Sequence, residues 1–226
     1  MFLFFVESRP KPNNMKPTAL FSSFFFLLFA FTTTTAEVLI DTDGDIVRNG
    51  WRYYLNPNSH VRGSGIIFSP IMHAHSCTLA VVDDPFNGGR ETTISSPLRI
   101  AFLTTNIPLN LSFADLPPNN CADQSKWVVT RPSLPTGKPV IVGSAEEFGD
   151  AFVHGWFFIK RYKLIVSERH YYKLVFCEEE NACKDVGVHV DKQNQRRLVV
   201  TDNEPLVFTI RKEWRRSSTS DLFMVV

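Results

Sequence analysis

The segment whose residue types most clearly indicate a chemical role is 95–102, SSPLRIAF, in which Arg99 is the lone charged side chain. Pro97 fixes its own φ angle and favours an extended conformation at Ser96. A stiff, extended segment that presents one guanidinium suits the active site of a trypsin-like protease, whose specificity pocket ends in a carboxylate. The alternative is a short strand with one exposed arginine, and these eight residues alone do not decide between the two.

The first part of the chain has the composition of a secretory signal. Residues 21–31 are almost entirely apolar, Lys16 precedes them, and the small residues 32–36 follow. A basic residue, a short apolar core and a small-residue exit are typical of such signals. The run is too short to cross a bilayer, which takes about 20 apolar residues. We therefore predict that residues 1–36 are an N-terminal extension and signal peptide, cleaved after Ala36.

The remaining residues, 37–226, suit a single β domain of ordinary size. The whole chain carries 24 Lys and Arg against 23 Asp and Glu, and removal of residues 1–36 leaves a net charge of about −1. This balance gives no basic surface for nucleic acid or for an anionic membrane, so we expect neither partner. The sequence has no nucleophile elbow, no phosphate loop and no His-Glu-x-x-His motif, so we expect no enzyme and no cofactor.

Four cysteines remain in the mature part of the chain: Cys77, Cys121, Cys177 and Cys183. An even number in an oxidising compartment indicates two disulfides. Four cysteines allow three pairings, of which the pairing of sequence neighbours is the simplest. Their spacing does not match a zinc site.

From residue 38 onward, short apolar runs alternate with turn residues, which is typical of an all-β barrel or sandwich. The runs expected to form strands are residues 38–40, 46–47, 51–55, 65–68, 77–82, 109–113, 127–130, 140–142, 155–159, 171–177, 198–200 and 206–210. Similar strands near residues 53, 128 and 174 suggest a threefold repeat of about 60 residues. One helical turn is expected after Ser144, with Glu147 at the capping-box position.

Three polar motifs have simple interpretations. Residues 41–45, DTDGD, resemble part of a calcium loop, but the glycine is fourth rather than sixth and no glutamate follows at position twelve, so we predict a turn. His73 and His75 lack a third ligand, so we predict no metal site. The sequence Asn110-Leu111-Ser112 is an N-glycosylation acceptor, which makes Asn110 a predicted modification site in a secreted chain.

The sequence LIDTDGDIV at residues 39–47, followed by YYL at 53–55, resembles the N-terminal signature of the Kunitz-type plant protease inhibitors, the soybean trypsin inhibitor family. Further similar segments follow in the same order along the whole mature chain. They are NG at 49–50, SPLRI at 96–100, PLNL at 108–111, Trp127, GWF at 155–157, YKLVFC at 172–177, DVG at 185–187, RRLVV at 196–200 and PL at 205–206. Several independent motifs in the right order make the resemblance specific.

This resemblance implies an all-β fold, the β-trefoil, with twelve strands in three repeats. Six strands would form a short barrel and six would cap it, and barrel closure would remove exposed sheet edges. The resemblance also implies the disulfides Cys77–Cys121 and Cys177–Cys183.

The resemblance further implies which residues inhibit a protease. The reactive loop would comprise Ser96, Pro97, Leu98, Arg99 and Ile100. Arg99 would be the primary specificity residue, the Arg99–Ile100 bond the scissile bond, and Asn49 the support of the loop. We therefore predict a monomeric inhibitor of trypsin-like serine proteases, secreted or vacuolar. The alternatives are a storage or protein- or carbohydrate-binding trefoil without inhibitory activity, or an inhibitor of subtilisin-type or cysteine proteases.

Overall fold

The computed structural model describes residues 36–58, 63–73, 76–116, 121–131, 137–164, 169–179 and 182–213. Residues 1–35 of the predicted signal peptide and His75 lie outside these ranges. The strands are β1 (Trp51–Pro57), β2 (Gly65–His73), β3 (Ser76–Asp84), β4 (Thr92–Ser95), β5 (Asn110–Phe113), β6 (Trp127–Thr130), β7 (Lys138–Val142), β8 (Phe152–Val153), β9 (Trp156–Tyr162), β10 (Tyr171–Cys177), β11 (Cys183–Val190), β12 (Arg196–Thr201) and β13 (Val207–Lys212).

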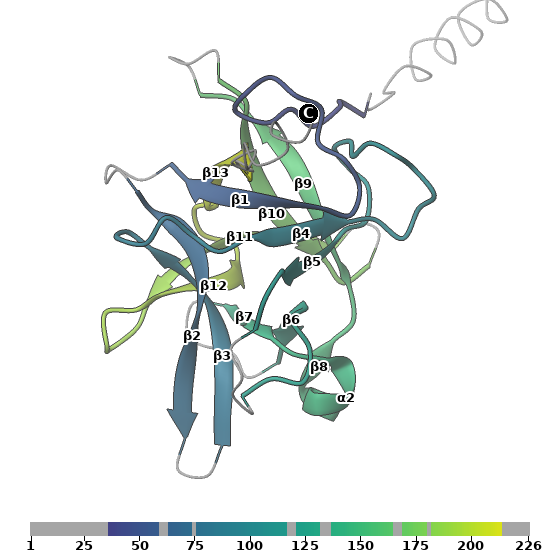
Figure 1. The fold of residues 1–226 in the computed structure, drawn as a ribbon. Helices are drawn as coiled ribbons and strands as arrows, with labels where there is room; N and C mark the ends of the chain where they lie inside the picture. The colour runs from purple at the N-terminus through teal and green to yellow at the C-terminus, as the bar shows by residue number, and fades with distance from the viewer. Residues whose placement is uncertain are drawn as a thin grey trace, which may run out of the picture. The chain divides into compact units, whose positions relative to one another are not determined.

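Six of these strands, β1, β4, β5, β9, β10 and β13, close into a barrel, which can be followed in Figure 1. Strand β1 pairs with β4 and β13, β4 pairs with β5, and β10 pairs with β9 and β13. The ring closes where Leu109, just before β5, forms an antiparallel bridge with Phe157 of β9, with 2.8 Å between the Leu109 nitrogen and the Phe157 oxygen. Closure leaves the barrel strands without a free edge.

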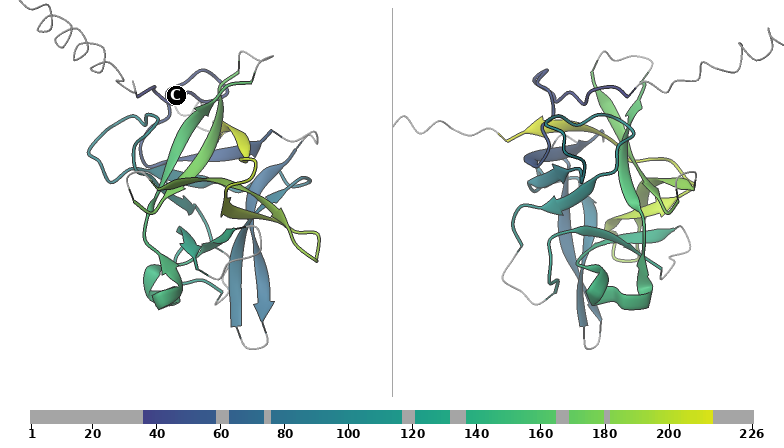
Figure 2. Two further views of the ribbon diagram at one scale, coloured as in Figure 1. Left: turned by 180° about the vertical axis from the view of Figure 1, so that it is seen from behind. Right: turned by 90° about the vertical axis from the view of Figure 1, so that its right-hand side faces the viewer.

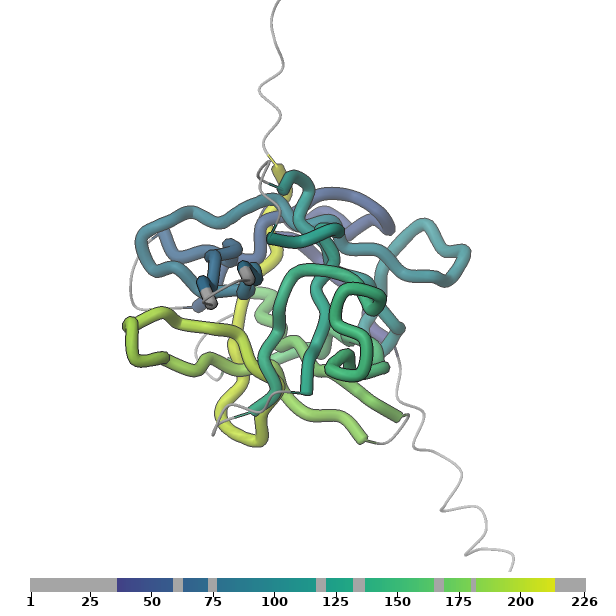
Figure 3. Tube along the Cα trace, turned by 90° about the horizontal axis from the view of Figure 1, so that it is seen from below, coloured from purple at the N-terminus to yellow at the C-terminus, as the bar shows by residue number. Residues whose placement is uncertain are grey.

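The other six long strands form three hairpins that cap the barrel: β2–β3, β6–β7 and β11–β12. One strand of each hairpin, β3, β7 and β12, pairs with the corresponding strands of the other two hairpins. Seen from below, the repeats lie as blue, green and yellow-green lobes around a common centre (Figure 3). The short β8 is an addition that pairs with β6. The predicted β-trefoil, with six barrel and six cap strands, is confirmed.

The repeats begin at β1, β5 and β10, whose first residues are Trp51, Asn110 and Tyr171, so the repeat length is close to 60 residues as predicted. Residue 128 does not lie in the first strand of the second repeat, as the similarity to residues 53 and 174 predicts; it lies in β6, the second strand of that repeat. Strand β5 is NLSF and buries alternate residues, whereas β6 is WVVT and buries all four. Strand β6 is therefore easier to recognise from its sequence than β5, because it is more apolar.

Local differences from the predicted strands follow from composition. Residues 38–40 and 46–47 form isolated bridges rather than strands. Strand β4 was not predicted because three of its four residues bear hydroxyl groups, although Thr92 is completely buried. Strand β11 was not predicted because charged residues and a glycine interrupt its valines. The predicted helical turn is α2 (Ala145–Phe148), and the Ser144 hydroxyl caps it by accepting a hydrogen bond of 3.2 Å from the Glu147 amide. It is followed by one 3₁₀ turn, η1 (Gly149–Ala151), which leads into β8, and α2 is the green helix low in both views of Figure 2. Among the described residues, no helix has the length and apolar character needed to cross a membrane.

Two buried tyrosines anchor the N-terminal segment to the barrel. The Tyr172 hydroxyl donates to the Ile40 carbonyl at 3.0 Å and accepts from the Ile40 amide at 2.8 Å. The Tyr53 hydroxyl accepts a hydrogen bond of 2.9 Å from the Arg48 amide. Burial raises the pKa of both phenols, so both stay neutral and can act as donors. Hydrogen bonds to these two core tyrosines therefore fix the position of residues 36–50 on the barrel.

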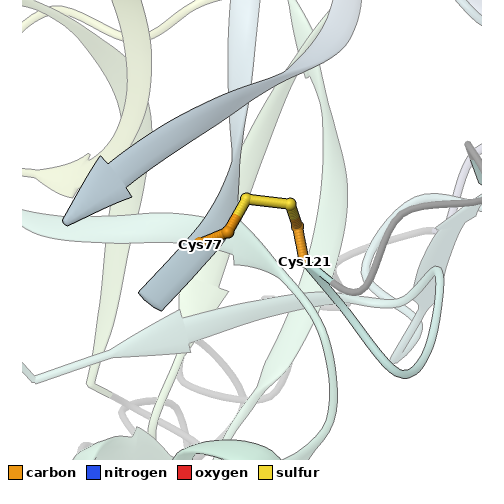
Figure 4. Close-up of a disulfide and its surroundings, with 2 residues drawn as sticks. All are labelled: Cys77 and Cys121. Atoms are coloured by element: carbon orange, nitrogen blue, oxygen red, sulfur yellow. A yellow bond between two sulfur atoms is a disulfide. The ribbon is translucent and has the colours of Figure 1, made fainter. Parts of the chain in front are cut away.

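The two disulfides have the pairing that the resemblance implies. Cys77 of β3 is bonded to Cys121 in the coil before β6 (Figure 4). Cys177 of β10 is bonded to Cys183 of β11, and these two residues also face each other in the β10–β11 ladder. The first bond closes a ring of chain that contains residues 96–100.

Candidate reactive loop

Residues 96–100 form a loop that follows β4, which ends at Ser95, so the alternative of a strand through residues 95–102 is wrong. In Figure 1 the connection between β4 and β5 projects from the right-hand side of the barrel. Pro97, Leu98 and Arg99 are exposed, while Ser96 and Ile100 are half-buried. The predicted loop residues are thus contiguous and accessible at their centre.

Both arms of the loop are held by one segment, residues 47–51. Before the loop, the Gly50 amide donates a hydrogen bond of 2.9 Å to the Ile94 carbonyl. After the loop, the Asn49 amide donates a hydrogen bond of 3.0 Å to the Ala101 carbonyl. Because adjacent residues of one turn bind both arms, the separation of the arms is fixed by the backbone of that turn.

The side chain of Asn49 fills the space between the arms. Its Oδ1 accepts a hydrogen bond of 2.8 Å from the Ser96 amide. Its Nδ2 donates to three loop carbonyls, those of Ile100 at 3.0 Å, Leu98 at 3.3 Å and Ser96 at 3.4 Å. A carboxamide carries two donor hydrogens and one acceptor oxygen, so it can satisfy both kinds of backbone group at once.

The position of Asn49 is itself set by the core. The Asn-Gly pair forms the predicted turn, with a hydrogen bond of 3.4 Å from the Trp51 amide to the Arg48 carbonyl. Gly50 has a φ angle of +76°, a left-handed conformation that glycine adopts without strain. The bond from the Arg48 amide to the buried Tyr53 hydroxyl fixes the start of this turn.

Contacts within the loop complete its shape. The Leu98 amide donates to the Ser96 hydroxyl at 3.3 Å, and the Ile100 amide donates to the Leu98 carbonyl at 2.9 Å. The Ile100 side chain packs against the hydrophobic core. Arg99 lies between these anchored residues and has no hydrogen-bond or ion-pair partner within the described part of the chain. Its guanidinium is therefore free to pair with an external carboxylate.

Sequence reasoning missed an apolar surface beside the loop. Trp51 is 43% exposed and Phe102 47%, which is high for such large side chains. Trp51 and Phe102 line one cleft, and the Arg48 guanidinium lies 4.6 Å from the centre of the Trp51 ring. The sequence signal was their position, since Trp51 directly follows the Asn-Gly turn and Phe102 lies close after Arg99.

The remaining predicted sites lie elsewhere. Asn110 begins β5 and is half-exposed. The predicted turn at residues 41–45 is confirmed, because the Asp41 carboxylate accepts hydrogen bonds of 2.9 Å from the amides of Asp43 and Asp45. Within the described ranges, no group of three or more His, Cys, Asp or Glu side chains could hold a metal ion.

Comparison with known proteins places this architecture in a family. The profile of the family described as "Trypsin and protease inhibitor", the legume Kunitz family, matches residues 39–212. The chain belongs to the Kunitz-type plant protease inhibitor family. A Kunitz-type trypsin inhibitor of Glycine max is 34% identical over 219 residues, which cover 91% of this chain and 100% of that protein.

Solved structures of Kunitz-type inhibitors are also similar. Trypsin inhibitor 1 from Senna obtusifolia aligns with a TM-score of 0.69 and 35% identity, covering 85% of this chain and 99% of that one. Soybean trypsin inhibitor in complex with porcine pancreatic trypsin aligns with a TM-score of 0.66 and 33% identity, covering 78% of this chain and 99% of the inhibitor. In this Kunitz-type chain the matched region spans the barrel, its cap and the candidate reactive loop.

Proposed function

We propose that this chain is a secreted inhibitor of trypsin-like serine proteases, with Arg99–Ile100 as its reactive bond. The observation that carries the proposal is the set of four hydrogen bonds from the Asn49 side chain to Ser96, Leu98 and Ile100. They hold an exposed arginine in a loop that is already shaped before any protease binds. Family members are protease inhibitors rather than enzymes, and the relatives reported above are trypsin inhibitors by name.

Binding would use the loop as a substrate-like segment. The Arg99 guanidinium would pair with the carboxylate of the specificity pocket through charge-assisted hydrogen bonds. The backbone on either side would lie along the active-site edge as an added strand. Since the loop is already ordered, little conformational entropy would be lost, which favours tight binding. Interfaces of this class bury roughly 1,600 Å² in total.

Net hydrolysis of the reactive bond would be slow because hydrogen bonds and a disulfide hold the two new chain ends in place. After cleavage of Arg99–Ile100, Ser96 would remain bonded to Asn49 Oδ1 and Ile100 to Asn49 Nδ2. The Cys77–Cys121 disulfide would keep the two pieces covalently joined. The new Ile100 amine would be held close to the new Arg99 carboxylate, which favours resynthesis of the peptide bond with release of the water taken up in the cleavage.

The route to the target protease follows from the N-terminal sequence. Kunitz-type plant inhibitors are typically secreted or vacuolar. We infer that residues 1–36 direct the chain into the secretory pathway and are removed, leaving residues 37–226 as one monomeric trefoil domain. Entry into that pathway also provides the oxidising conditions that disulfides need.

The proposal is tested by titrating trypsin with oxidised residues 37–226 and with two variants. Arg99→Ala should weaken inhibition by about 3–4 kcal/mol, roughly 10²- to 10³-fold, because a central anchor dominates such interfaces. Lys192→Ala is the matched control, since it removes another exposed basic side chain, in the β11–β12 turn. It should leave inhibition unchanged.

Two results would overturn the proposal. Equal inhibition by wild type and Arg99→Ala would show that another residue enters the specificity pocket. Failure of the wild-type protein to inhibit trypsin would favour the alternatives, which a panel containing a subtilisin-type and a cysteine protease would then separate from a non-inhibitory trefoil.

A further inference from the structure

A cleft on the side of the barrel lies between β5, β9 and the residues of α2. It has a volume of about 390 Å³, within the range of sites for small ligands. Asn110 and Trp156 line it, and the exposed side chains of Lys126, Glu146 and His154 add polar groups around them. None of these residues contributes to the reactive loop.

The barrel closure brings the predicted glycosylation acceptor next to a tryptophan. The antiparallel bridge joins Leu109 to Phe157, and both side chains are buried, at 1% and 4% exposure. Side chains alternate between the two faces of a strand. The next pair, Asn110 and Trp156, therefore points outward from two adjacent segments of the barrel wall. Directly opposed residues of this kind have Cβ atoms about 4.5–5.5 Å apart.

Trp156 is exposed and its backbone is firmly placed. Its side chain is 43% exposed although it is one of the largest apolar groups in the chain. The preceding residue is Gly155, where an added Cβ would lie 2.4 Å from Phe176 Cζ and 2.5 Å from the Cys177 carbonyl oxygen. Only a residue without a side chain lets β9 pack this closely, so the strand that carries the indole is fixed against β10.

We propose that Asn110 carries an N-linked glycan whose first N-acetylglucosamine lies on the face of Trp156, in this cleft. The inference rests on the secretory route proposed above. The donor is a lipid-linked oligosaccharide pyrophosphate. The Asn110 amide nitrogen forms a bond to C1 of the sugar, the bond from C1 to the pyrophosphate oxygen breaks, and the nitrogen loses one proton. In the described part of the chain the Asn110 carboxamide has no hydrogen-bond partner, so no protein contact is lost.

The chemistry of the cleft fits a sugar ring. The face of an indole carries negative charge density, and the C–H bonds on one face of a pyranose present weakly positive hydrogens to it. Lys126 and Glu146 offer a charged donor and a charged acceptor for the hydroxyls of the ring. An exposed tryptophan would thereby be covered by a group attached to its own chain.

The position of Trp156 also decides where the glycan goes. On its other side Asn110 pairs with Ser95, the last residue before the reactive loop. A glycan held on Trp156 is directed across β9 and away from Arg99. A glycan on β5 that lies in the cleft would therefore leave the neighbouring reactive loop accessible to a protease.

The experiment is a cycle of four proteins secreted from a eukaryotic host: the wild type, Ser112→Ala, Trp156→Ala and the double variant. The two proteins that keep the acceptor motif are trimmed to a single N-acetylglucosamine by an endoglycosidase. Ser112→Ala removes the acceptor motif and leaves Asn110 in place, and Trp156→Ala removes the ring. Peptide mapping should show the sugar on Asn110. The sugar should raise the melting temperature by roughly 2–4 °C in the wild-type background, the size of one good contact in a domain of this size.

In Trp156→Ala this rise should fall below about 1 °C, and Trp156→Tyr, which keeps a flat ring, should restore most of it. Trp51→Ala is the matched control, because Trp51 is also 43% exposed, and its rise should equal that of the wild type. An unmodified Asn110, or the same rise with and without Trp156, would overturn the inference. Trypsin inhibition measured on the same samples reports separately on the proposed function.

Discussion

Replacement of Asn49 by alanine tests the support of the reactive loop. Of the four contacts, those to the Ser96 amide (2.8 Å) and the Ile100 carbonyl (3.0 Å) have good hydrogen-bond lengths, while those at 3.3 and 3.4 Å are weak. A hydrogen bond contributes about 1 kcal/mol net, so the two good ones are worth about 2 kcal/mol. We expect Asn49→Ala to weaken trypsin inhibition by about 2 kcal/mol, roughly 30-fold.

The same variant should affect cleavage of the reactive loop more than the stability of the fold. Its melting temperature should fall by no more than about 4–8 °C, the equivalent of about 2 kcal/mol in a domain of this size, because the core contacts of the turn run through backbone groups and Tyr53 and are kept. Cleavage of Arg99–Ile100 should become faster, since the new ends are no longer held for resynthesis. Mass spectrometry of samples taken during incubation with trypsin measures this rate, beside inhibition titrations.

Two further variants make the test specific. Asn49→Asp keeps the acceptor for the Ser96 amide but places an anionic oxygen against three carbonyl oxygens at 3.0–3.4 Å, so it should inhibit more weakly than Asn49→Ala. Asn203→Ala removes an exposed asparagine and should behave as the wild type. Equal inhibition and equal cleavage rates for wild type and Asn49→Ala would refute the supporting role.

Two predictions concern stability. On the chain-entropy model, the Cys77–Cys121 ring contributes about 4 kcal/mol and the Cys177–Cys183 ring about 2 kcal/mol, so replacing the first pair by serine should lower the urea midpoint more; the reverse order would contradict this. Burial raises the pKa of Asp191, but the amides of Gln195 and Gln193 and the Arg197 guanidinium together hold it below its usual value. Its carboxylate therefore stabilises the fold above the unfolded pKa of about 3.9, and this stabilisation is lost as the pH falls through the lower folded pKa. The difference in unfolding free energy between wild type and Asp191→Asn should be present at pH 7 and shrink below about pH 4; a difference independent of pH would contradict it.

The sequence predicted the fold best where burial is continuous. Strands β6 (Trp127–Thr130) and β10 (Tyr171–Cys177) have the predicted bounds, because nearly all their residues are buried and apolar. Strand β4 was missed because three of its four residues, including the buried Thr92, are hydroxyl-bearing. Tertiary pairing with β1 and β5 decides its conformation, and a local pattern does not contain that information.

The residues of the candidate site could be predicted from the sequence, but the contacts between them could not. An Asn-Gly pair by itself indicates a turn, and only the resemblance gave Asn49 a supporting role. That its amide reaches three carbonyls depends on both arms of the loop returning to the same turn. The pairing of Asn110 with Trp156 could not be predicted either, because it depends on the bridge between Leu109 and Phe157 that closes the barrel.

The central claim is that trypsin treats Arg99–Ile100 as a substrate bond that it cannot efficiently destroy. The most direct measurement is incubation of the oxidised inhibitor with a catalytic amount of trypsin, followed by identification of every new terminus. We predict one new N-terminus at Ile100, pieces that separate only after disulfide reduction, and a mixture of intact and cleaved inhibitor that is reached from either pure form. Inhibition without this cut, or a cut at another lysine or arginine while residues 99–100 stay intact, would contradict the account.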